Sequence, residues 1–308
     1  MISVLVPTFN HEKYIAKALD SILMQKTRYS TEVLVGEDAS TDSTRAVLKE
    51  YEKAHPGKLK VFYRETNMFR CEITNGADLR LRSRGKYLIT LEGDDFWTDE
   101  NKLEEEVSFL ESHPDYTAVA HNCIVVDENN EPTGESYPEC KDELYTLEHF
   151  LRGIMPGQLT TMLCRNFMTQ DIFDKTILEK RLSPGDKIMF FALVSCGKIH
   201  CIQKPMSAYR HIIKSGSSYS ANYKFDFKKD ENWYKTMLDF SRTLSNEKAE
   251  KCMEALYLGC LIHGMKEKQL TRKEYTEYKK NIRHKLSAKK LFAQRMWSIK
   301  ITKKGSAN

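Results

Sequence analysis

Hydrophobic and polar positions follow two alternating periods through residues 2–202. Short apolar runs typical of strands are mostly followed by segments in which apolar side chains recur every three or four positions, as on one face of a helix. We expect strands at 2–6, 32–35, 60–63, 86–91, 117–126, 159–164 and 199–202. We expect helices at 12–23, at 44–54 behind capping residues 40–43, at 72–84, at 99–112 and at 188–196. This order predicts an α/β fold with a mostly parallel central sheet flanked by helices.

Two regions depart from this alternation. Residues 128–157 contain Pro132, Pro138 and the Pro156-Gly157 pair, and we interpret them as a long loop or small excursion beside the sheet. From about residue 225 to 301 the pattern is helical and poor in glycine. We therefore expect a helical C-terminal extension after the sheet-forming part of the chain.

Polar side chains gather where three of the expected strands end. Thr8-Phe9-Asn10 follows the first strand, Glu37-Asp38 the second, and Glu92-Gly93-Asp94-Asp95 the strand at 86–91. In open parallel sheets ligands bind beyond the carboxyl ends of the strands. We expect these three segments to meet at one edge of the sheet and to form the functional site.

The acidic segment after the strand at 86–91 has two possible explanations. Three carboxylates within four residues repel one another, and burial opposes their charge. A divalent cation would resolve this conflict, because carboxylate oxygens are ligands that Mg²⁺ and Mn²⁺ accept. The alternative is a solvated turn in which Gly93 makes the bend.

The amino-acid composition indicates the class of protein, but it does not decide between a metal site and a solvated turn. The 308 residues are 41% hydrophobic and 30% charged, which is typical of a globular protein. We see no apolar run of transmembrane length and no signal-peptide pattern, and we expect a cytoplasmic chain. The eight cysteines form no Cys-x-x-Cys pair, so we expect free thiols and no zinc site. P-loop, Gly-x-Gly-x-x-Gly and Gly-x-Ser-x-Gly motifs are absent.

The net charge of +5 is concentrated near the C-terminus, where residues 266–304 carry fourteen Lys and Arg against three Glu. Aromatic and aliphatic residues mix with these cations from 285 to 304, a pattern that is compatible with a helix at a membrane surface. The alternative is a helix that packs on the rest of the chain and exposes a basic face. No nucleic-acid recognition motif accompanies the charge, and we expect no nucleic-acid partner.

Three segments of the sequence are distinctive when taken together. They are Ile2-Ser-Val-Leu-Val-Pro-Thr-Phe-Asn10, Val33-Leu-Val-Gly-Glu-Asp-Ala-Ser-Thr-Asp-Ser-Thr44 and Gly85-Lys-Tyr-Leu-Ile-Thr-Leu-Glu-Gly-Asp-Asp95. In this order they resemble family 2 glycosyltransferases of the GT-A fold. The resemblance covers about residues 1–215. The sequence of the last segment is similar to that of the bacterial members of the family that build surface polysaccharides. The resemblance implies a Rossmann-like catalytic domain at 1–215, with a nucleotide-binding half at about 1–115 and an acceptor half at about 116–215. The helical, basic region would then span 216–308.

The resemblance also implies an activity. It is the inverting transfer of a sugar from a nucleotide-sugar donor to a hydroxyl of a glycan or lipid-linked acceptor, with Mg²⁺ or Mn²⁺. We expect the donor to be a UDP-sugar. The setting would be bacterial surface polysaccharide synthesis, in the cytoplasm or peripherally at the inner face of the membrane. The alternative is a nucleotide-sugar-binding or assembly protein that has lost catalysis. Two departures from the family pattern motivate this alternative: Glu92 stands where the family commonly has Asp, and Gly185 stands before Asp186 where the family has Glu.

Roles for the donor site follow from the resemblance position by position. Pro7, Thr8 and Phe9 would line the base pocket, and Asp38 would accept a hydrogen bond from the base. Asp95 would be the direct metal ligand, and Asp94 would hold the ribose or a metal-bound water. Whether Glu92 contacts the metal is left open, since its longer side chain shifts the carboxylate.

The remaining roles concern catalysis and the acceptor. Asp186, which opens the helix at 188–196, would be the base that deprotonates the acceptor hydroxyl, with an ordinary helix cap as the alternative. Arg210 and His211 would contact the diphosphate or the metal, or else belong to a loop. The acceptor pocket would be lined by Trp97, Phe96 and His121, unless these side chains belong to the core.

Overall fold

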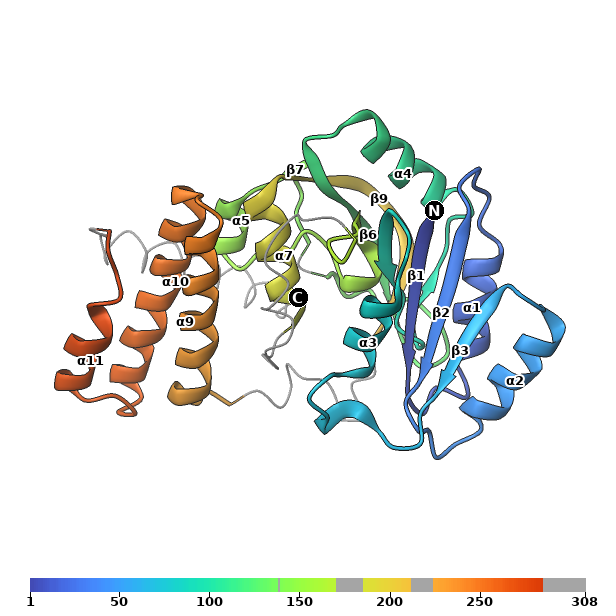
Figure 1. Cartoon of the computed structure of the whole chain (residues 1–308), viewed down its shortest axis with the longest axis horizontal. Coiled ribbons are helices and arrows are strands. Elements are labelled where there is room, and N and C mark those ends of the chain that lie inside the picture. The colour runs from blue at the N-terminus through green and yellow to red at the C-terminus, as the bar shows by residue number, and fades with distance from the viewer. Residues whose placement is uncertain (138, 170–184, 212–223, 285–308) are drawn as a thin grey trace. The chain divides into compact units, whose positions relative to one another are not determined.

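The computed structural model describes residues 1–137, 139–169, 185–211 and 224–284 (Figure 1). The described residues divide into two compact units. The first contains 1–137, 139–145, 156–169 and 197–211, and the second contains 146–155, 185–196 and 224–284. The first unit holds the sheet, and the second is helical.

Four parallel strands form one half of the sheet. They are β1 (Ile2–Thr8), β2 (Thr31–Glu37), β3 (Leu59–Tyr63) and β4 (Tyr87–Thr90), and they lie in the order β3-β2-β1-β4. The central strand β1 is buried along almost its whole length. Its Val4 and Val6 belong to a single apolar core with Ile89 of β4. Burial on both faces explains why these strands read as continuous apolar runs.

Helices cover both faces of these four strands. Figure 1 shows α3 (Asn75–Arg82) on the opposite side of the strands from α1 (Ile15–Leu23) and α2 (Thr44–Ala54). The buried face of α1 carries Ile15, Leu19 and Ile22, at the spacing that predicted the helix. Helix α4 (Lys102–Ser112) places Leu103, Val107 and Leu110 in the same core.

The other half of the sheet is mixed rather than parallel. The long strands β6 (Tyr116–Val126) and β9 (Lys198–Arg210) pair in parallel. The short strand β8 (Leu163–Arg165) joins β4 to β6 and is antiparallel to both. The two-residue strands β5 (Phe96–Trp97) and β7 (Leu144–Tyr145) pair antiparallel with β9.

Three sequence expectations differ in detail from the structure. Strand β1 runs through Pro7 to Thr8, because β4 pairs only as far as Leu5 and no ladder donor is required at position 7. The strand expected at 159–164 begins as a 3-10 turn, Leu159–Thr161, before β8. The strand expected at 199–202 continues to Arg210. Its end lies next to residues 92–95, which follow β4 and are called the acidic turn below.

The second unit is a cluster of helices. It consists of α5 (Leu147–Leu151), α7 (Gly185–Cys196), α9 (Phe227–Thr243), α10 (Glu247–Lys266) and α11 (Arg272–Lys279). Helix α10 contacts α5, α9 and α11. None of the helices in the described part of the chain is both long and apolar enough to cross a membrane. The basic segment at 285–308, for which both a membrane-surface helix and a packed helix were considered, lies outside the described residues.

Candidate active site

The three polar strand ends meet at one edge of the sheet, as the sequence predicted. The backbone N–H of Asp38 donates to the carbonyl of Thr8 at 3.0 Å, which joins the ends of β2 and β1. On the other side of β1, the N–H of Gly93 donates to the carbonyl of Pro7 at 3.1 Å. The loops after β1, β2 and β4 therefore start from one continuous edge.

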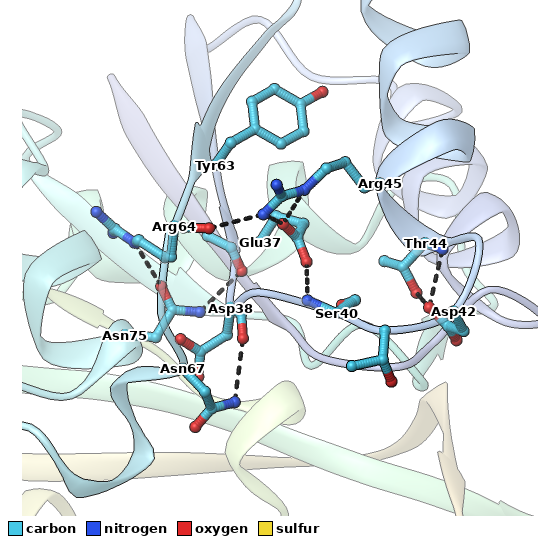
Figure 2. A network of polar contacts seen from close by, with 12 residues as sticks. Glu37, Asp38, Ser40, Asp42, Thr44, Arg45, Tyr63, Arg64, Asn67 and Asn75 are labelled. Carbon is cyan, nitrogen blue, oxygen red and sulfur yellow. Dashed lines mark hydrogen bonds and ion pairs between the residues drawn. The ribbon is translucent and has the colours of Figure 1, made fainter.

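Hydrogen bonds that involve side chains join the loop after β1 to the loop after β2. Asn10 has a positive φ of 56°, and its Oδ1 accepts the N–H of Thr41 at 2.8 Å. The N–H of His11 donates to Oγ1 of Thr44 at 2.8 Å, and Oγ1 of Thr44 donates to Oδ1 of Asp42 at 2.6 Å. Figure 2 shows the Asp42–Thr44 contact at the start of α2. These bonds fix the two loops relative to each other.

Asp38 lies at this edge, and a hydrogen bond orients its carboxylate. It is 8% exposed, and its Oδ1 accepts the backbone N–H of Met68 at 2.7 Å. Its carbonyl accepts Nδ2 of Asn67 at 3.0 Å (Figure 2). Burial raises the pKa of Asp38, and the hydrogen bond from Met68 opposes that shift. Oδ2 accepts no hydrogen bond from the described residues, so Asp38 retains an acceptor for a ligand N–H.

Glu37, which directly precedes Asp38, is fully buried. Its carboxylate pairs with Arg45, whose Nε lies 2.7 Å from Oε2, and its Oε1 accepts the N–H of Ser40 at 2.6 Å (Figure 2). Gly36 is required beside it, because a Cβ at position 36 would lie 2.2 Å from Oδ1 of Asn75. Nδ2 of Asn75 donates to the Gly36 carbonyl at 2.8 Å. The contact with Asn75 therefore explains the glycine at position 36, and the pair with Arg45 explains how the buried carboxylate of Glu37 is compensated.

Asp95 and Asp94 face different surroundings within the acidic turn. Asp95 is 1% exposed, and its two carboxylate oxygens accept Oγ1 of Thr160 and the backbone N–H of Arg210, each at 2.8 Å. Burial raises the pKa of Asp95 well above its ordinary value, and the charges of Asp94 and Glu92 add to the shift. The Asp94 side chain is 31% exposed. This geometry favours Asp94 over Asp95 as a direct metal ligand, the reverse of the assignment made from position alone.

Arg210 holds the acidic turn from the end of β9. Its Nε donates to the Asp94 carbonyl at 2.8 Å, and its Nη2 donates to Oδ1 of Asn130 at 2.7 Å. Nη1 donates to the carbonyl of Asp127, and the guanidinium lies 4.2 Å from the ring centroid of Tyr14. The residue is 4% exposed. These bonds assign Arg210 to positioning the turn, and they give no support to a direct contact with diphosphate.

A divalent cation fits the acidic turn. One carboxylate oxygen from each of Glu92, Asp94 and Asp95 lies within 4.8 Å of the other two. Oxygen donors of this kind suit Mg²⁺ or Mn²⁺. The predicted ligand His211 is not part of this group; its Nδ1 lies 2.7 Å from Oε2 of Glu135. Of the two proposed explanations, the geometry is more consistent with a metal site than with a fully solvated turn, since Asp95 is buried.

The three residues predicted to line an acceptor pocket are buried. Phe96 is 8% exposed, and Lys17 Nζ lies 3.8 Å from its ring centroid. Trp97 is buried, and its Nε1 donates to the carbonyl of Thr160 at 3.3 Å. His121 is fully buried, and its pKa is well below the ordinary value because of burial. Their burial favours the core alternative and gives no support to stacking on a sugar.

The other predicted site residues are placed as follows. Thr8 is buried, whereas Phe9 is exposed beside it and can contact a ligand. Asp186 is half-buried in the first turn of α7, and its Oδ1 accepts the N–H of Lys187 at 2.8 Å. Asp186 belongs to the second unit, so its predicted role as a base stays a prediction.

Two residues of the site were missed by sequence reasoning. His11 directly follows Thr8-Phe9-Asn10, and its Nε2 lies 3.8 Å from Oδ2 of Asp94. Its position after a recognised segment was the signal that could have found it. Thr160 supports Asp95 from a 3-10 turn, and no local pattern in the sequence distinguishes it from other threonines.

An acidic turn and an oriented Asp38 lie at the carboxyl edge of parallel strands, which is where open α/β folds bind their ligands. The profile of glycosyl transferase family 2 matches residues 3–175, more than half of the chain, which therefore belongs to this family. The recognition made from the three sequence segments is confirmed.

Curated relatives match part of the chain. An uncharacterised protein of Mycobacterium tuberculosis is 36% identical over 136 residues, which cover 44% of this chain and 39% of that protein. The protein named putative glycosyltransferase EpsE of Bacillus subtilis is 31% identical over 127 residues, covering 41% of this chain and 44% of EpsE. The chain thus matches less than half the length of these relatives.

The fold is also similar to that of a solved structure. Staphylococcus aureus TarS 1–349, in complex with UDP-GlcNAc, aligns with a TM-score of 0.61 at 19% identity, covering 90% of this chain and 78% of that chain. At this identity the likeness concerns the fold alone, and it confirms the predicted GT-A architecture.

Proposed function

We propose that this chain transfers a sugar from a UDP-sugar donor to a hydroxyl of a glycan or lipid-linked acceptor. The transfer would invert the anomeric configuration, depend on a divalent cation and serve bacterial surface polysaccharide synthesis. Family membership and the glycosyltransferase names of relatives such as EpsE support this class of reaction. The complex of TarS with UDP-GlcNAc supports the choice of donor class.

One observation carries the proposal. The carboxylate of Asp38 and the acidic turn at Asp94 lie on either side of Thr8, joined to β1 by backbone hydrogen bonds. A nucleotide has a base at one end and a charged diphosphate at the other, and it needs complementary groups in that order. Asp38 would accept an N–H of uracil, while Pro7, Thr8 and Phe9 would line the adjoining part of the base site.

The acidic turn would hold the divalent cation mainly through Asp94, with Glu92 and Asp95 close by. Such a cation, when bound, neutralises charge on the leaving diphosphate. Asp95 would keep the turn in place through Thr160 and the N–H of Arg210. Because Asp95 is buried between two donors, its contribution would be orientation rather than direct binding.

Asp186 would act as the general base. It would take the proton from the acceptor hydroxyl as that oxygen attacks the anomeric carbon and the bond to the diphosphate breaks. We expect Asp186→Asn to abolish transfer while UDP binding is unchanged, because the amide cannot accept the proton. Full transfer activity in Asp186→Asn would refute this assignment.

Calorimetry tests the donor site directly. UDP should bind in the presence of Mn²⁺ or Mg²⁺ and lose affinity when the cation is chelated. Asp38→Asn should weaken UDP binding by about tenfold or more, since a charged acceptor is lost. Asp20→Asn, on the exposed face of α1, is the matched control and should bind UDP as the parent does. Absence of UDP binding with either cation would refute the proposed function.

The sugar and the membrane role need separate measurements. Donor hydrolysis across a panel of UDP- and GDP-sugars would identify the sugar and test the preference for uracil. We also propose that the basic segment 285–308 associates with membranes. Removing it should reduce binding to vesicles that contain anionic lipid, and unchanged binding would favour the packed-helix alternative.

A further inference from the structure

His11 lies against the acidic turn at a distance that a metal ion can bridge. Its Nε2 is 3.8 Å from Oδ2 of Asp94, which is too far for a hydrogen bond. Two ligand atoms that are each about 2.1 Å from a shared ion are separated by at most about 4.2 Å. The observed gap is therefore compatible with both atoms binding one ion.

The imidazole is oriented by its neighbours. Its Nδ1 lies 3.3 Å from Oγ1 of Thr8, and its backbone N–H donates to Oγ1 of Thr44 at 2.8 Å. In the tautomer with hydrogen on Nδ1, Thr8 accepts that hydrogen and the lone pair of Nε2 is directed to the Asp94 side. Histidine ligands in proteins commonly donate from their other ring nitrogen in this way. Gly93 leaves room for the ring, because a Cβ there would lie 2.8 Å from Nδ1.

We infer that His11 is a nitrogen ligand, beside Asp94, of the divalent cation in the donor site. This inference rests on the metal dependence of the proposed function and assigns a residue that the acidic turn alone does not include. An imidazole ligand suits transition-metal ions, whereas Mg²⁺ takes oxygen ligands. The site would therefore bind Mn²⁺ in preference to Mg²⁺.

The other histidines considered for this site have different partners. His211 pairs with Glu135 through Nδ1 at 2.7 Å. His121 is fully buried and lies 3.9 Å from Glu106. Among the histidines that the structure describes, His11 is the one paired with a carboxylate of the acidic turn.

Electron spin echo measurements of bound Mn²⁺ test the inference, because a directly bound imidazole produces modulation from ¹⁴N. The 308-residue chain would be loaded with Mn²⁺ alone and with Mn²⁺ plus UDP. We expect ¹⁴N modulation in the parent and its loss in His11→Gln. The dissociation constant for Mn²⁺ should be about tenfold larger in that variant. His55→Gln is the matched control, since His55 is also half-buried beside a tyrosine, and it should retain the modulation.

Two further variants separate the outcomes. His11→Asn provides a second replacement should the glutamine variant misfold, and His211→Gln tests the alternative imidazole. Modulation that survives in both His11 variants, or that disappears in His211→Gln, would overturn the inference. Bound Mn²⁺ without ¹⁴N modulation in the parent would do so too, while leaving the proposed function standing. A parent chain that binds no Mn²⁺, with or without UDP, would overturn the metal dependence of the proposed function and this inference together.

Discussion

The backbone N–H of Arg210 donates to Oδ1 of Asp95 at 2.8 Å, across 115 positions in the sequence. This bond ties the last residue of β9 to the acidic turn after β4. The side chain of Arg210 extends the connection to the carbonyls of Asp94 and Asp127. The turn is therefore held from the far half of the sheet, and its geometry depends on a residue outside the acidic segment.

We expect Arg210→Lys to lower the free energy of unfolding by about 2 kcal/mol, because hydrogen bonds from a buried charged donor are lost. Lysine keeps the charge but cannot reach the same three acceptors. Urea unfolding measures the loss, and UDP calorimetry measures its effect on the turn. Arg84→Lys, with an exposed side chain, should leave both values unchanged. Parent-like stability in Arg210→Lys would show that these bonds add little.

Gly93 should tolerate no side chain. A Cβ at this position would lie 2.6 Å from Oγ1 and 2.8 Å from Cβ of Thr8, and the latter atom is fixed by the strand. We expect Gly93→Ala to destabilise the fold by about 1–3 kcal/mol and to weaken UDP binding. Gly76→Ala in α3 has only the end of Arg80 nearby, at 3.9 Å, and should be neutral or stabilising by up to about 1 kcal/mol. Equal effects of the two substitutions would contradict the packing argument.

The sequence predicted the elements and the meeting of the strand ends because both depend on local patterns. Periodicity located the strand that ends at Thr8, and parallel order brought Asp38 and the acidic turn to its side. The sequence did not predict which carboxylate of the acidic turn would be buried. That distinction comes from Thr160 and Arg210, which approach from distant segments.

The mixed half of the sheet was harder to predict for the same reason. Strand β8 has three residues and β5 has two, too few for a period to be recognised. The buried state of Trp97 and His121 likewise depends on tertiary neighbours. Their chemistry alone fits an acceptor pocket as well as a core.

Glu106 should give the stability of the protein a measurable pH dependence. It is fully buried next to Lys102, whose Nζ lies 2.6 Å from Oε2, and burial raises the pKa of Glu106 to about 7. The folded protein therefore binds this proton more tightly than the unfolded chain does. Its contribution to stability is greatest below the ordinary pKa of 4.5 and is lost as the pH rises to about 7.

Replacing Glu106 by Gln removes this titration. We expect the slope of unfolding free energy against pH, between about 4.5 and 7, to become less negative in Glu106→Gln. His121, with its lowered pKa, contributes the opposite slope, but it is present in both proteins. Urea unfolding across this pH range supplies the comparison, with Glu105→Gln on the solvent side of α4 as control. Identical slopes in the parent and Glu106→Gln would refute the raised pKa.

Glu254 anchors the end of the described helical unit. It is fully buried in α10; its Oε1 accepts the N–H of Arg283 at 2.7 Å, and its Oε2 accepts the N–H of His284 at 3.0 Å. Arg242 Nη2 lies 3.5 Å from Oε1 and supplies a compensating charge. Because a glutamine side chain has one acceptor oxygen, Glu254→Gln leaves at least one of these N–H groups without its partner.

We expect Glu254→Gln to cost about 2 kcal/mol and to speed amide hydrogen exchange at positions 283 and 284 by about tenfold or more. Hydrogen exchange followed by mass spectrometry measures the local effect, and urea unfolding measures the global one. Glu267→Gln, an exposed residue at the end of α10, is the matched control and should change neither. Unchanged exchange at both positions in Glu254→Gln would show that the carboxylate does not hold residues 283 and 284 in place.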